Sequence, residues 1–346
     1  MSETSTTGRV DLDWKNLGFS LLPTDYNLLY RWRDGGWSAA EVRSSAEYTL
    51  PLGATALHYG QSVFEGLKAF ETGDGRAVMF RPDQNAARMA RGARKLLMQA
   101  FPEDLFVAAC RQVVKLNRRY LPPSDSGASL YLRPLLFGSS GLLGVRPADE
   151  YIFGVFCTPV GPYFGGELAP IKLAVEEETH RAAPLGVGDV KAAGNYAAGM
   201  RAVARAKAAG FDNVLYLDAR ESKYIDETGA TNFFGIRRDG DGSYTYVTPR
   251  SLSILPSITN DSLMTIARDL GLRVEQRPVA ATELTEFVEA GCCGTAAVIT
   301  PVKSVQLGQK HIEYGQPGEV TRALYKRLTE IQRGNASDDH NWVVDV

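Results

Sequence analysis

Hydrophobic periodicity along the first half of the chain predicts a sheet accompanied by two helices. Apolar runs that alternate with polar residues, or that end at Gly and Pro, indicate strands, whereas apolar residues every three or four positions indicate helices. Pro82 and Asp83 are residues typical of a first helical turn. The predicted strands are 42–51, 67–71, 77–81, 129–140 and 149–160, and the predicted helices are 82–98 and 103–120.

The second half of the chain has more strands than a regular alternation of strands and helices would contain. No GxGxxG opens a helix and no GxxxxGK[ST] is present, so a Rossmann sheet is not predicted. The pattern instead favours a mixed α/β fold. The predicted strands are 171–177, 213–218, 223–227, 231–237, 244–249, 272–279 and the end of 293–305, and the predicted helices are 197–210, 257–271, 282–291 and the end of 311–334.

The length of 346 residues favours two domains rather than one core. A Gly- and Pro-rich stretch, VGPYFGGELAP, follows the strand that ends near residue 160 and is typical of a linker. We therefore expect a first domain at 1–157, a linker at 158–170 and a second domain at 171–346.

Charge and cysteine content narrow the possible functions. The net charge is −2 and no block of like charges occurs, which argues against a nucleic-acid partner or an anionic membrane surface. No stretch is long and apolar enough to span a bilayer, and the N-terminus lacks an apolar signal core. The four cysteines form no CxxC pair and have no nearby His, so no metal site is predicted. We expect Cys110, Cys157, Cys292 and Cys293 to be buried thiols of a cytoplasmic protein.

The stretch DVKAAGNY (189–196) contains the first candidate for catalysis. Lys191 stands between Val190 and two alanines, where little room is left for hydration of an ammonium group. Desolvation lowers the pKa of a lysine and leaves a nucleophilic amine, which is what a carbonyl cofactor needs to form a Schiff base. The alternative is a surface lysine at the start of an Ala-rich helix.

Three further segments suit a pyridoxal phosphate cofactor. Glu227 ends a predicted strand, and its carboxylate could keep a pyridine nitrogen protonated; a solvated strand end is the alternative. Ser257, Ile258 and Thr259 open a predicted helix, where free N–H groups and hydroxyls suit a phosphate, although ordinary capping explains them equally. Arg81 would add a bidentate cation. In GTAA (294–297), Thr295 could serve the phosphate, and the amides of Thr295 and Ala296 a carboxylate, unless the segment is only a tight turn.

Tyr131 and Arg133 lie two residues apart on a predicted strand. Side chains at i and i+2 point to one face of a sheet, and Pro134 keeps Arg133 extended. A phenol beside a guanidinium suits a substrate that carries a carboxylate, and an exposed polar face is the alternative.

These pieces belong to a longer series of motifs that runs from about Leu50 to Val305. In chain order the motifs are HYGQSVFEGLKAF, FRP, YLRPLLF, GPYF, KAAGNYAAG, YIDETGATNFF, ILPSITNDS and GTAAVITPV. Together they resemble the branched-chain amino-acid aminotransferases of fold-type IV. That pyridoxal-phosphate group also includes D-amino-acid aminotransferases and aminodeoxychorismate lyases.

The resemblance implies a fold, a reaction and an assembly. The fold would be a smaller N-terminal α/β domain and a larger C-terminal domain with a mixed or antiparallel barrel-like sheet. The reaction would be reversible, ping-pong transfer of an amino group between L-leucine, L-isoleucine or L-valine and 2-oxoglutarate. A homodimer, or a higher homo-oligomer, is the family expectation. D-amino-acid transamination, the lyase reaction, and cofactor binding without turnover stay open as alternatives.

The resemblance also implies a role for each matching residue. Lys191 would be the Schiff-base lysine and proton shuttle, Tyr196 the partner of the cofactor's ring oxygen and Glu227 the partner of its pyridine nitrogen. Arg133 would receive the distal carboxylate of glutamate. The phosphate ligands would be Arg81, Ile258, Thr259 and Thr295, and the α-carboxylate site would be Tyr131 with the amides of Thr295 and Ala296. The side-chain pocket would consist of Phe64, Gly66, Tyr163 and Tyr196. The groups supplied across a dimer would be Tyr59 and part of the loop 141–145.

Two departures from relatives affect what is expected. Some relatives carry CxxC just after the GTA turn, whereas residues 297–300 here are Ala-Val-Ile-Thr, so redox switching of that kind is not expected. The turn after Glu227 varies among relatives, so Ala230 and Thr231 are not assigned to the site.

Overall fold

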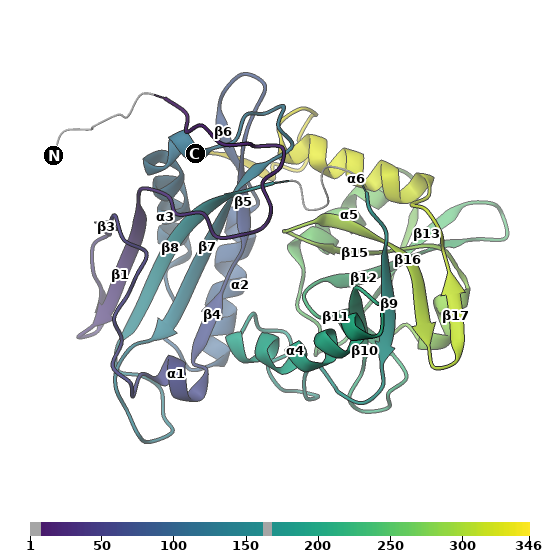
Figure 1. The fold of residues 1–346 in the computed structure, drawn as a ribbon, viewed down its shortest axis with the longest axis horizontal. Coiled ribbons are helices and arrows are strands. Elements are labelled where there is room, and N and C mark those ends of the chain that lie inside the picture. Colours follow the sequence, from purple (N-terminus) through teal and green to yellow (C-terminus); the bar gives the residue numbers. More distant parts are fainter. Residues whose placement is uncertain (1–7, 162–167) are drawn as a thin grey trace. The chain divides into compact units, whose positions relative to one another are not determined.

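The computed structural model describes residues 8–161 and 168–346. The chain forms two compact units. The first unit contains Met1–Gly166 together with Glu330–Val346, and the second contains Glu167–Thr329. Each unit is built around its own nine-stranded sheet (Figure 1).

The sheet of the first unit has the strand order β18-β6-β5-β7-β8-β1-β2, with β3 paired to β1 and β4 paired to β7. Its neighbouring strands are antiparallel, and β7 and β8 pair along their whole length of ten residues. The strands are β1 (Asn27–Arg33), β2 (Gly36–Trp37), β3 (Glu41–Arg43), β4 (Ser62–Phe64), β5 (Leu67–Glu71), β6 (Ala77–Phe80), β7 (Ser129–Gly138), β8 (Tyr151–Val160) and β18 (Val343–Asp345).

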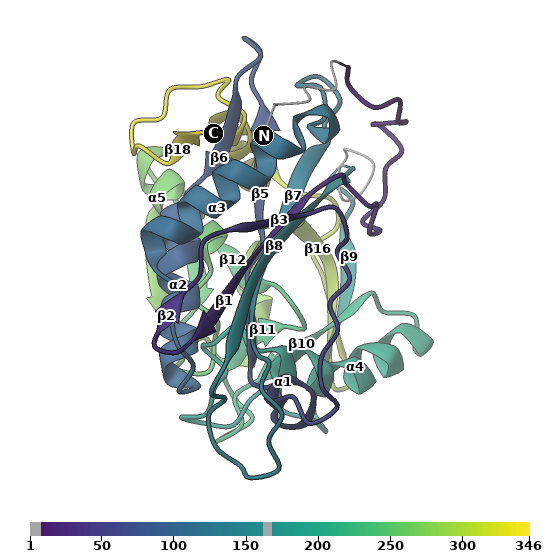
Figure 2. The same ribbon diagram turned by 90° about the vertical axis from the view of Figure 1, so that its left-hand side faces the viewer.

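Two helices, α2 (Pro82–Lys95) and α3 (Glu103–Leu116), pack together beside this sheet (Figure 2). The face toward α3 is aromatic: the rings of Phe101 and Phe153 stack with centroids 3.8 Å apart, and Phe106 and Tyr30 contact the same ring of Phe153. Because side chains alternate along a strand, the opposite face of β7 carries Tyr131 and Arg133. A short helix, α1 (Thr55–Tyr59), and a 3-10 turn, η1 (Arg118–Tyr120), complete the unit.

The second unit is a closed barrel. Its strands follow the order β11-β10-β9-β16-β15-β12, and pairing of β11 with β12 closes the ring. β13 and β14 extend the sheet beyond β12, and β17 forms a hairpin with β16. The strands are β9 (Ile171–Glu176), β10 (Asn213–Leu217), β11 (Ile225–Thr228), β12 (Asn232–Arg238), β13 (Tyr244–Pro249), β14 (Arg273–Arg277), β15 (Phe287–Gly294), β16 (Val298–Leu307) and β17 (Lys310–Glu313).

Three α-helices and a 3-10 turn accompany the barrel strands. They are α4 (Ala193–Ala208), α5 (Ile258–Asp269), α6 (Glu319–Gln332) and η2 (Ala281–Thr285). An open sheet in one unit and a closed barrel in the other confirm the mixed α/β architecture and the barrel-like second sheet that the motifs implied.

Most predicted elements are found within a few residues, and two predictions were wrong. The segment 42–51 is a strand only as far as Arg43, because it pairs with β1 alone and only over three residues. The segment 282–291 is not a helix: η2 ends at Thr285 and the remaining residues form β15. Pairing with β12 and β16 on both sides outweighs the helix propensity of this segment, and Gly291 leaves room for the ring of Phe234 on β12. The strand β1 was not predicted.

The end of the chain departs from the expected domain division. The sequence placed all of 171–346 in the second domain, whereas Glu330–Val346 packs with the first unit. The cause is β18, which pairs antiparallel with β6 from Val343 to Asp345. A three-residue edge strand after a polar segment has no distinctive sequence signal, so only the tertiary structure reveals it.

Candidate active site

Lys191 and Tyr196 lie at the start of α4. The Lys191 Nζ donates to the Tyr196 hydroxyl at 3.0 Å and lies 5.3 Å from the centre of the same ring. The loop before the helix is held by Asn195, whose Nδ2 donates to the carbonyls of Val187 at 2.8 Å and Val190 at 2.9 Å. Val190 and Ala192, on either side of the lysine, are buried. The amine and the phenol therefore have a fixed relative position.

Glu227 lies on β11 and is almost fully buried. Its Oε1 is 3.0 Å from Nη1 of Arg181, and its Oε2 accepts from Nδ2 of Asn232 at 3.1 Å. Burial raises the pKa of the Glu227 carboxyl to about 7, and the neighbouring Arg181 opposes this rise. The contacts with Arg181 and Asn232 favour the ionised carboxylate, which is the form that a protonated pyridine nitrogen would need.

The barrel register places the remaining second-unit candidates at the same end of the sheet. Glu227 pairs with Asn232, and Asn232 pairs with Cys293 on β15. The turn that contains Thr295 and Ala296 follows directly, between the paired residues Gly294 and Val298.

The start of α5 is attached to this same end of the barrel. Asn232 also donates to the carbonyl of Leu255 at 3.0 Å, just before the helix that begins at Ile258. Ser257 caps that helix by accepting from the N–H of Asn260 at 3.1 Å, and Thr259 is buried in its first turn. Arg181 joins the loop that precedes Lys191 to the segment that precedes α5. Its Nη2 donates to the carbonyl of Gly188 at 2.9 Å and to the carbonyl of Ser253.

Backbone strain occurs at two of the predicted binding segments. Val298, which ends the GTAA turn, has φ of +63°, a conformation that β-branched residues rarely adopt. Arg81, which precedes α2, has φ of +49°. Strained residues of this kind cost of order 1–3 kcal/mol each and cluster at functional sites. Positive φ also occurs at other non-glycine residues, among them Asp34, Leu97 and Ser222, so it does not by itself mark a binding segment.

The first unit brings four other candidates together on the sheet face opposite α3. Nη2 of Arg133 donates to the hydroxyl of Tyr131 at 3.3 Å, and its guanidinium carbon lies 5.0 Å from the ring centre of Phe64. Within the described part of the chain, Nε of Arg133 has no hydrogen-bond partner. A side chain at Gly66 would overlap the Tyr131 hydroxyl, so only glycine fits there.

Tyr59 lies apart from this cluster, at the end of α1. Its side chain is exposed, and its hydroxyl donates to the carbonyl of Leu143 in the loop 141–145. Tyr163 lies outside the described residues. Arg81 lies at the N-cap of α2, where its N–H donates to the carbonyl of Trp342 at 2.8 Å.

Arg181 and Asn232 are residues that the sequence did not single out. Both contact the Glu227 carboxylate, and Arg181 is 46 positions away from it along the chain. No local pattern marks an arginine at that separation. Asn232 could have been found, because it is the only residue in its stretch TNFFGI with a side chain able to donate two hydrogen bonds beside the expected Glu227.

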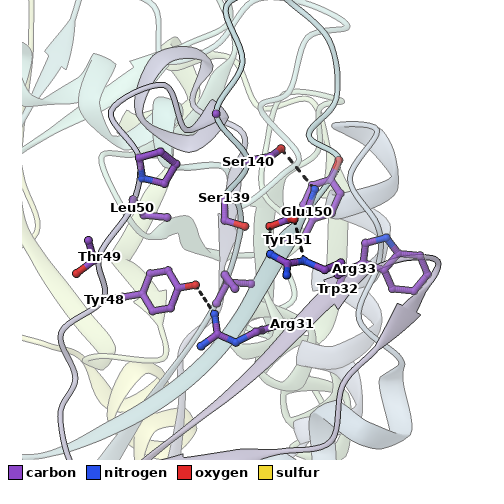
Figure 3. Close-up of a pocket in the computed structure, with 13 residues that line it drawn as sticks. Arg31, Trp32, Arg33, Tyr48, Thr49, Leu50, Ser139, Ser140, Glu150 and Tyr151 are labelled. Carbon is purple, nitrogen blue, oxygen red and sulfur yellow. Dashed lines mark hydrogen bonds and ion pairs between the residues drawn. The ribbon is translucent and has the colours of Figure 1, made fainter.

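A cavity of about 280 Å³ in the first unit is lined by none of the residues predicted to bind the cofactor, although Gly141 of the loop 141–145 lies in its wall (Figure 3). Its two guanidinium groups are already paired: Arg31 donates to the Tyr48 hydroxyl at 2.7 Å, and Arg33 is 2.8 Å from Glu150. The candidate chemistry therefore lies elsewhere.

Comparison with known proteins agrees with this geometry. The family model for amino-transferase class IV matches residues 62–305. A branched-chain-amino-acid aminotransferase from Haemophilus influenzae is 47% identical over 345 residues, covering 97% of this chain and 99% of the relative. The Escherichia coli branched-chain amino acid aminotransferase structure superposes with a TM-score of 0.77 at 28% identity, covering 92% of this chain and 98% of its own.

A second solved structure holds the cofactor. The branched-chain amino acid aminotransferase from Thermobaculum terrenum, in its PLP-form (holo-form), gives a TM-score of 0.77 at 25% identity, covering 93% of this chain and 98% of its own. The chain belongs to the class IV aminotransferase family and is a transaminase of fold-type IV. Its relatives at 40–47% identity over nearly the full chain are branched-chain aminotransferases.

Neither a membrane-spanning helix nor a metal cluster occurs among the described residues. No helix among them is long and apolar enough to cross a bilayer. Across 8–161 and 168–346, no group of three or more His, Cys, Asp or Glu side chains is arranged to hold a metal ion. The four cysteines are buried and unbridged, as predicted.

Proposed function

We propose that this transaminase uses pyridoxal 5'-phosphate to exchange amino groups between branched-chain L-amino acids and 2-oxoglutarate. The observation that carries the proposal is the arrangement at one end of the barrel. There the Lys191 amine contacts a phenol, and the buried Glu227 carboxylate is held by Arg181 and Asn232. The names of relatives that align over nearly the whole chain support the branched-chain substrates.

The residues present fit this cofactor. Lys191 would hold its aldehyde carbon, Tyr196 its ring oxygen and Glu227 its pyridine nitrogen. Ile258 and Thr259, at the start of α5, and Thr295 offer N–H groups and hydroxyls to a phosphate, and Arg81 would supply the balancing charge. When bound, the cofactor withdraws electrons from the substrate's Cα and so makes its proton removable.

Each side chain then has a defined task. The Lys191 Nζ accepts the proton from the substrate's Cα and holds it until it is returned. The Tyr196 hydroxyl, 3.0 Å away, fixes the direction of that amine. Arg181 and Asn232 keep the Glu227 carboxylate in place through both of its oxygens. The small Ala and Gly residues that follow Lys191 in the sequence leave space for a planar ring.

The substrate must be either aliphatic or acidic in its side chain. Tyr131 and the amides of Thr295 and Ala296 would bind the α-carboxylate, which both kinds of substrate share. Arg133 would bind the distal carboxylate of glutamate, and its Nε without a partner among the described residues is the donor available for it. The apolar walls would be Phe64, Gly66, Tyr163 and Tyr196.

We also propose a homodimer. Leu52, Leu57, Leu143 and Val145 are large apolar side chains that are 60–89% exposed. They lie on or beside α1 and the loop 141–145, which the backbone bond from Leu142 to Gly53 joins. A surface of this kind is typical of a protein–protein contact. In such a dimer, Tyr59 and the loop would reach the partner's substrate site. Analytical ultracentrifugation would test dimer formation by measuring the mass of the assembly in solution.

The buried thiols fit a reducing compartment, and we propose the cytoplasm.

A substrate panel tests the function. With 2-oxoglutarate as acceptor, L-leucine, L-isoleucine and L-valine should each be deaminated, and D-alanine should not. Preference for D-donors would instead identify a D-amino-acid aminotransferase, and release of pyruvate from aminodeoxychorismate would identify a lyase. Absence of any half-reaction with leucine would leave a cofactor-binding protein without turnover. Lys191→Ala should abolish turnover; full activity of that variant would disprove the assignment of the lysine.

A further inference from the structure

The C-terminal segment of the chain is part of the first unit at the place where Arg81 lies. β18 pairs with β6, with Val343 opposite Phe80, the residue immediately before Arg81. The N–H of Arg81 donates to the carbonyl of Trp342 at 2.8 Å. The backbone of the C-terminal segment therefore holds Arg81 at the point where it adopts its strained positive φ.

Trp342 also contacts the side chain of Arg81. The guanidinium carbon lies 5.0 Å from the centre of the Trp342 ring, within the range of a cation–π interaction. The indole is buried and fixed by its own neighbours: Phe80 packs edge-on at 5.6 Å, and His340 stacks at 4.6 Å. Arg81 is thus placed over a rigid aromatic surface rather than left to sample many rotamers.

Contact with an aromatic ring is compatible with phosphate binding by the same guanidinium. All five donors of a guanidinium lie in its plane, so contact through the face does not involve the edge, which forms bidentate bonds with phosphate. Holding the side chain in advance removes part of the entropy that would be lost on binding.

We infer that Trp342 is a positioning residue for the cofactor phosphate, acting through Arg81, so that the C-terminal segment is part of the cofactor site. This inference rests on the proposed role of Arg81 as a phosphate ligand. It assigns to the last residues of the chain a role in cofactor retention that neither their position nor their composition indicates.

The test compares two cofactor forms that differ only in the phosphate. Dissociation constants of pyridoxal 5'-phosphate and of pyridoxal are measured on the full chain by absorbance titration. The variant Trp342→Leu keeps apolar bulk but removes the ring. It should raise the dissociation constant of pyridoxal 5'-phosphate by about 3- to 30-fold, the range expected for the loss of a cation–π contact. Pyridoxal binding should stay unchanged. For Trp342→Phe, the dissociation constant of pyridoxal 5'-phosphate should lie between those of Trp342→Leu and the parent chain.

Phe70→Leu is the matched control. The guanidinium carbon of Arg333 lies 5.5 Å from the Phe70 ring, so this variant removes a similar contact elsewhere in the same unit. It should change neither dissociation constant. Folding of each variant is verified by far-ultraviolet circular dichroism, and Trp342→Phe provides the measurement if Trp342→Leu does not fold.

The variant Arg81→Gln distinguishes the proposed role of Arg81 as a phosphate ligand from the proposed role of Trp342 in positioning it. If Arg81→Gln leaves pyridoxal phosphate affinity unchanged, the proposed role of Arg81 is wrong. If Arg81→Gln weakens it but neither Trp342 variant does, only the role of Trp342 is overturned. Equal weakening of pyridoxal and pyridoxal phosphate by the Trp342 variants would also overturn it, because a general packing defect does not distinguish the two forms.

Discussion

Each unit contains one buried glutamate bound by an arginine and an asparagine, and the two clusters differ in how completely their polar atoms are paired. In the first unit, the Glu65 carboxylate accepts hydrogen bonds from Nε and Nη2 of Arg88, both at 2.7 Å. It also accepts from Nδ2 of Asn85 at 2.8 Å and from the N–H of Gly66 at 3.2 Å. Four donors satisfy a carboxylate whose side chain is 0% exposed.

The second cluster is also buried, but some of its polar atoms are not paired. Glu227 is contacted by Nη1 of Arg181, by Nδ2 of Asn232 and by the backbone N–H of Leu255. Nε of Arg181 and Oδ1 of the adjacent Asp226 are buried without a hydrogen-bond partner among the described residues. Such atoms cost free energy, and a bound ligand could pair with them.

The two clusters differ in the roles that we propose for them, one in stability and one in cofactor binding. Glu65 lies between Phe64 and Gly66, and Arg88 and Asn85 anchor it to α2. Its cluster therefore fixes the strand that would form the substrate pocket. Glu227 has fewer partners than Glu65, and burial raises the pKa of its carboxyl to about 7. The first cluster should control stability and the second activity.

Arg88→Met should have the largest effect, on stability. It leaves the Glu65 carboxylate buried without its main partner, which typically costs about 3–5 kcal/mol. All four tryptophans, Trp14, Trp32, Trp37 and Trp342, belong to the first unit, so tryptophan fluorescence during denaturation reports on that unit alone. An unchanged unfolding midpoint would refute the structural assignment of this pair.

Glu227→Gln should reduce activity without a comparable loss of stability. The variant is nearly isosteric and keeps a hydrogen-bonding group, but it removes the negative charge that would stabilise a protonated pyridine nitrogen. A loss of about 100-fold or more in kcat/KM is expected, the size seen when one preorganised electrostatic partner is removed. The matched variant Glu65→Gln should instead lower the midpoint of denaturation measured by tryptophan fluorescence. Near-parental activity of Glu227→Gln would contradict the proposal that the second cluster controls activity.

The pH dependence of stability should reveal Glu227 directly. Its native pKa of about 7 exceeds the ordinary value of 4.5, so the folded state binds the proton more tightly than the unfolded state. This stabilisation is complete below pH 4.5 and is lost as the pH rises to about 7, by at most about 1.4 kcal/mol per pH unit. Circular dichroism melts of the cofactor-free chain at pH 5 and pH 7 should show it. The decrease should be smaller in Glu227→Gln, and an identical pH profile would contradict the assignment.

The smallest effect is expected at an exposed Glu–Arg pair. Glu150 and Arg33 are 2.8 Å apart at the cavity in Figure 3, and their side chains are 37% and 65% exposed. Solvent screens such a pair, so Glu150→Gln should leave the fluorescence midpoint of the first unit almost unchanged. A shift as large as that of Arg88→Met would mean that pairing, rather than burial, determines the importance of these glutamates.

Sequence reasoning predicted the elements best where periodicity and turn residues agree. The hairpin of β5 and β6 is found as expected because TGDG supplies its turn, and α2 begins at Pro82 because proline suits the first helical position. It was wrong where tertiary pairing outweighs local preference, as in β15. It also did not anticipate β1, whose NLLYRWR pattern becomes a strand through its pairing with β8.

The candidate site was predictable only in part, for the same reason. The motif KAAGNYAAG, through its family resemblance, pointed to both Lys191 and Tyr196, and Tyr131 and Arg133 share a strand face by simple alternation. Arg181 could not be found, because its contact with Glu227 depends on barrel closure rather than on spacing.

The sequence by itself determined the mixed α/β class and the family, and it indicated Lys191 as the candidate Schiff-base lysine, because these depend on residue type and local order. Only the tertiary structure decided which distant residues contact the charged groups. It placed Arg181 against Glu227, Arg88 against Glu65 and Trp342 against Arg81, pairs that are 46, 23 and 261 positions apart. The physical reason is that burial and pairing of charges depend on distance in space, which strand pairing and barrel closure establish.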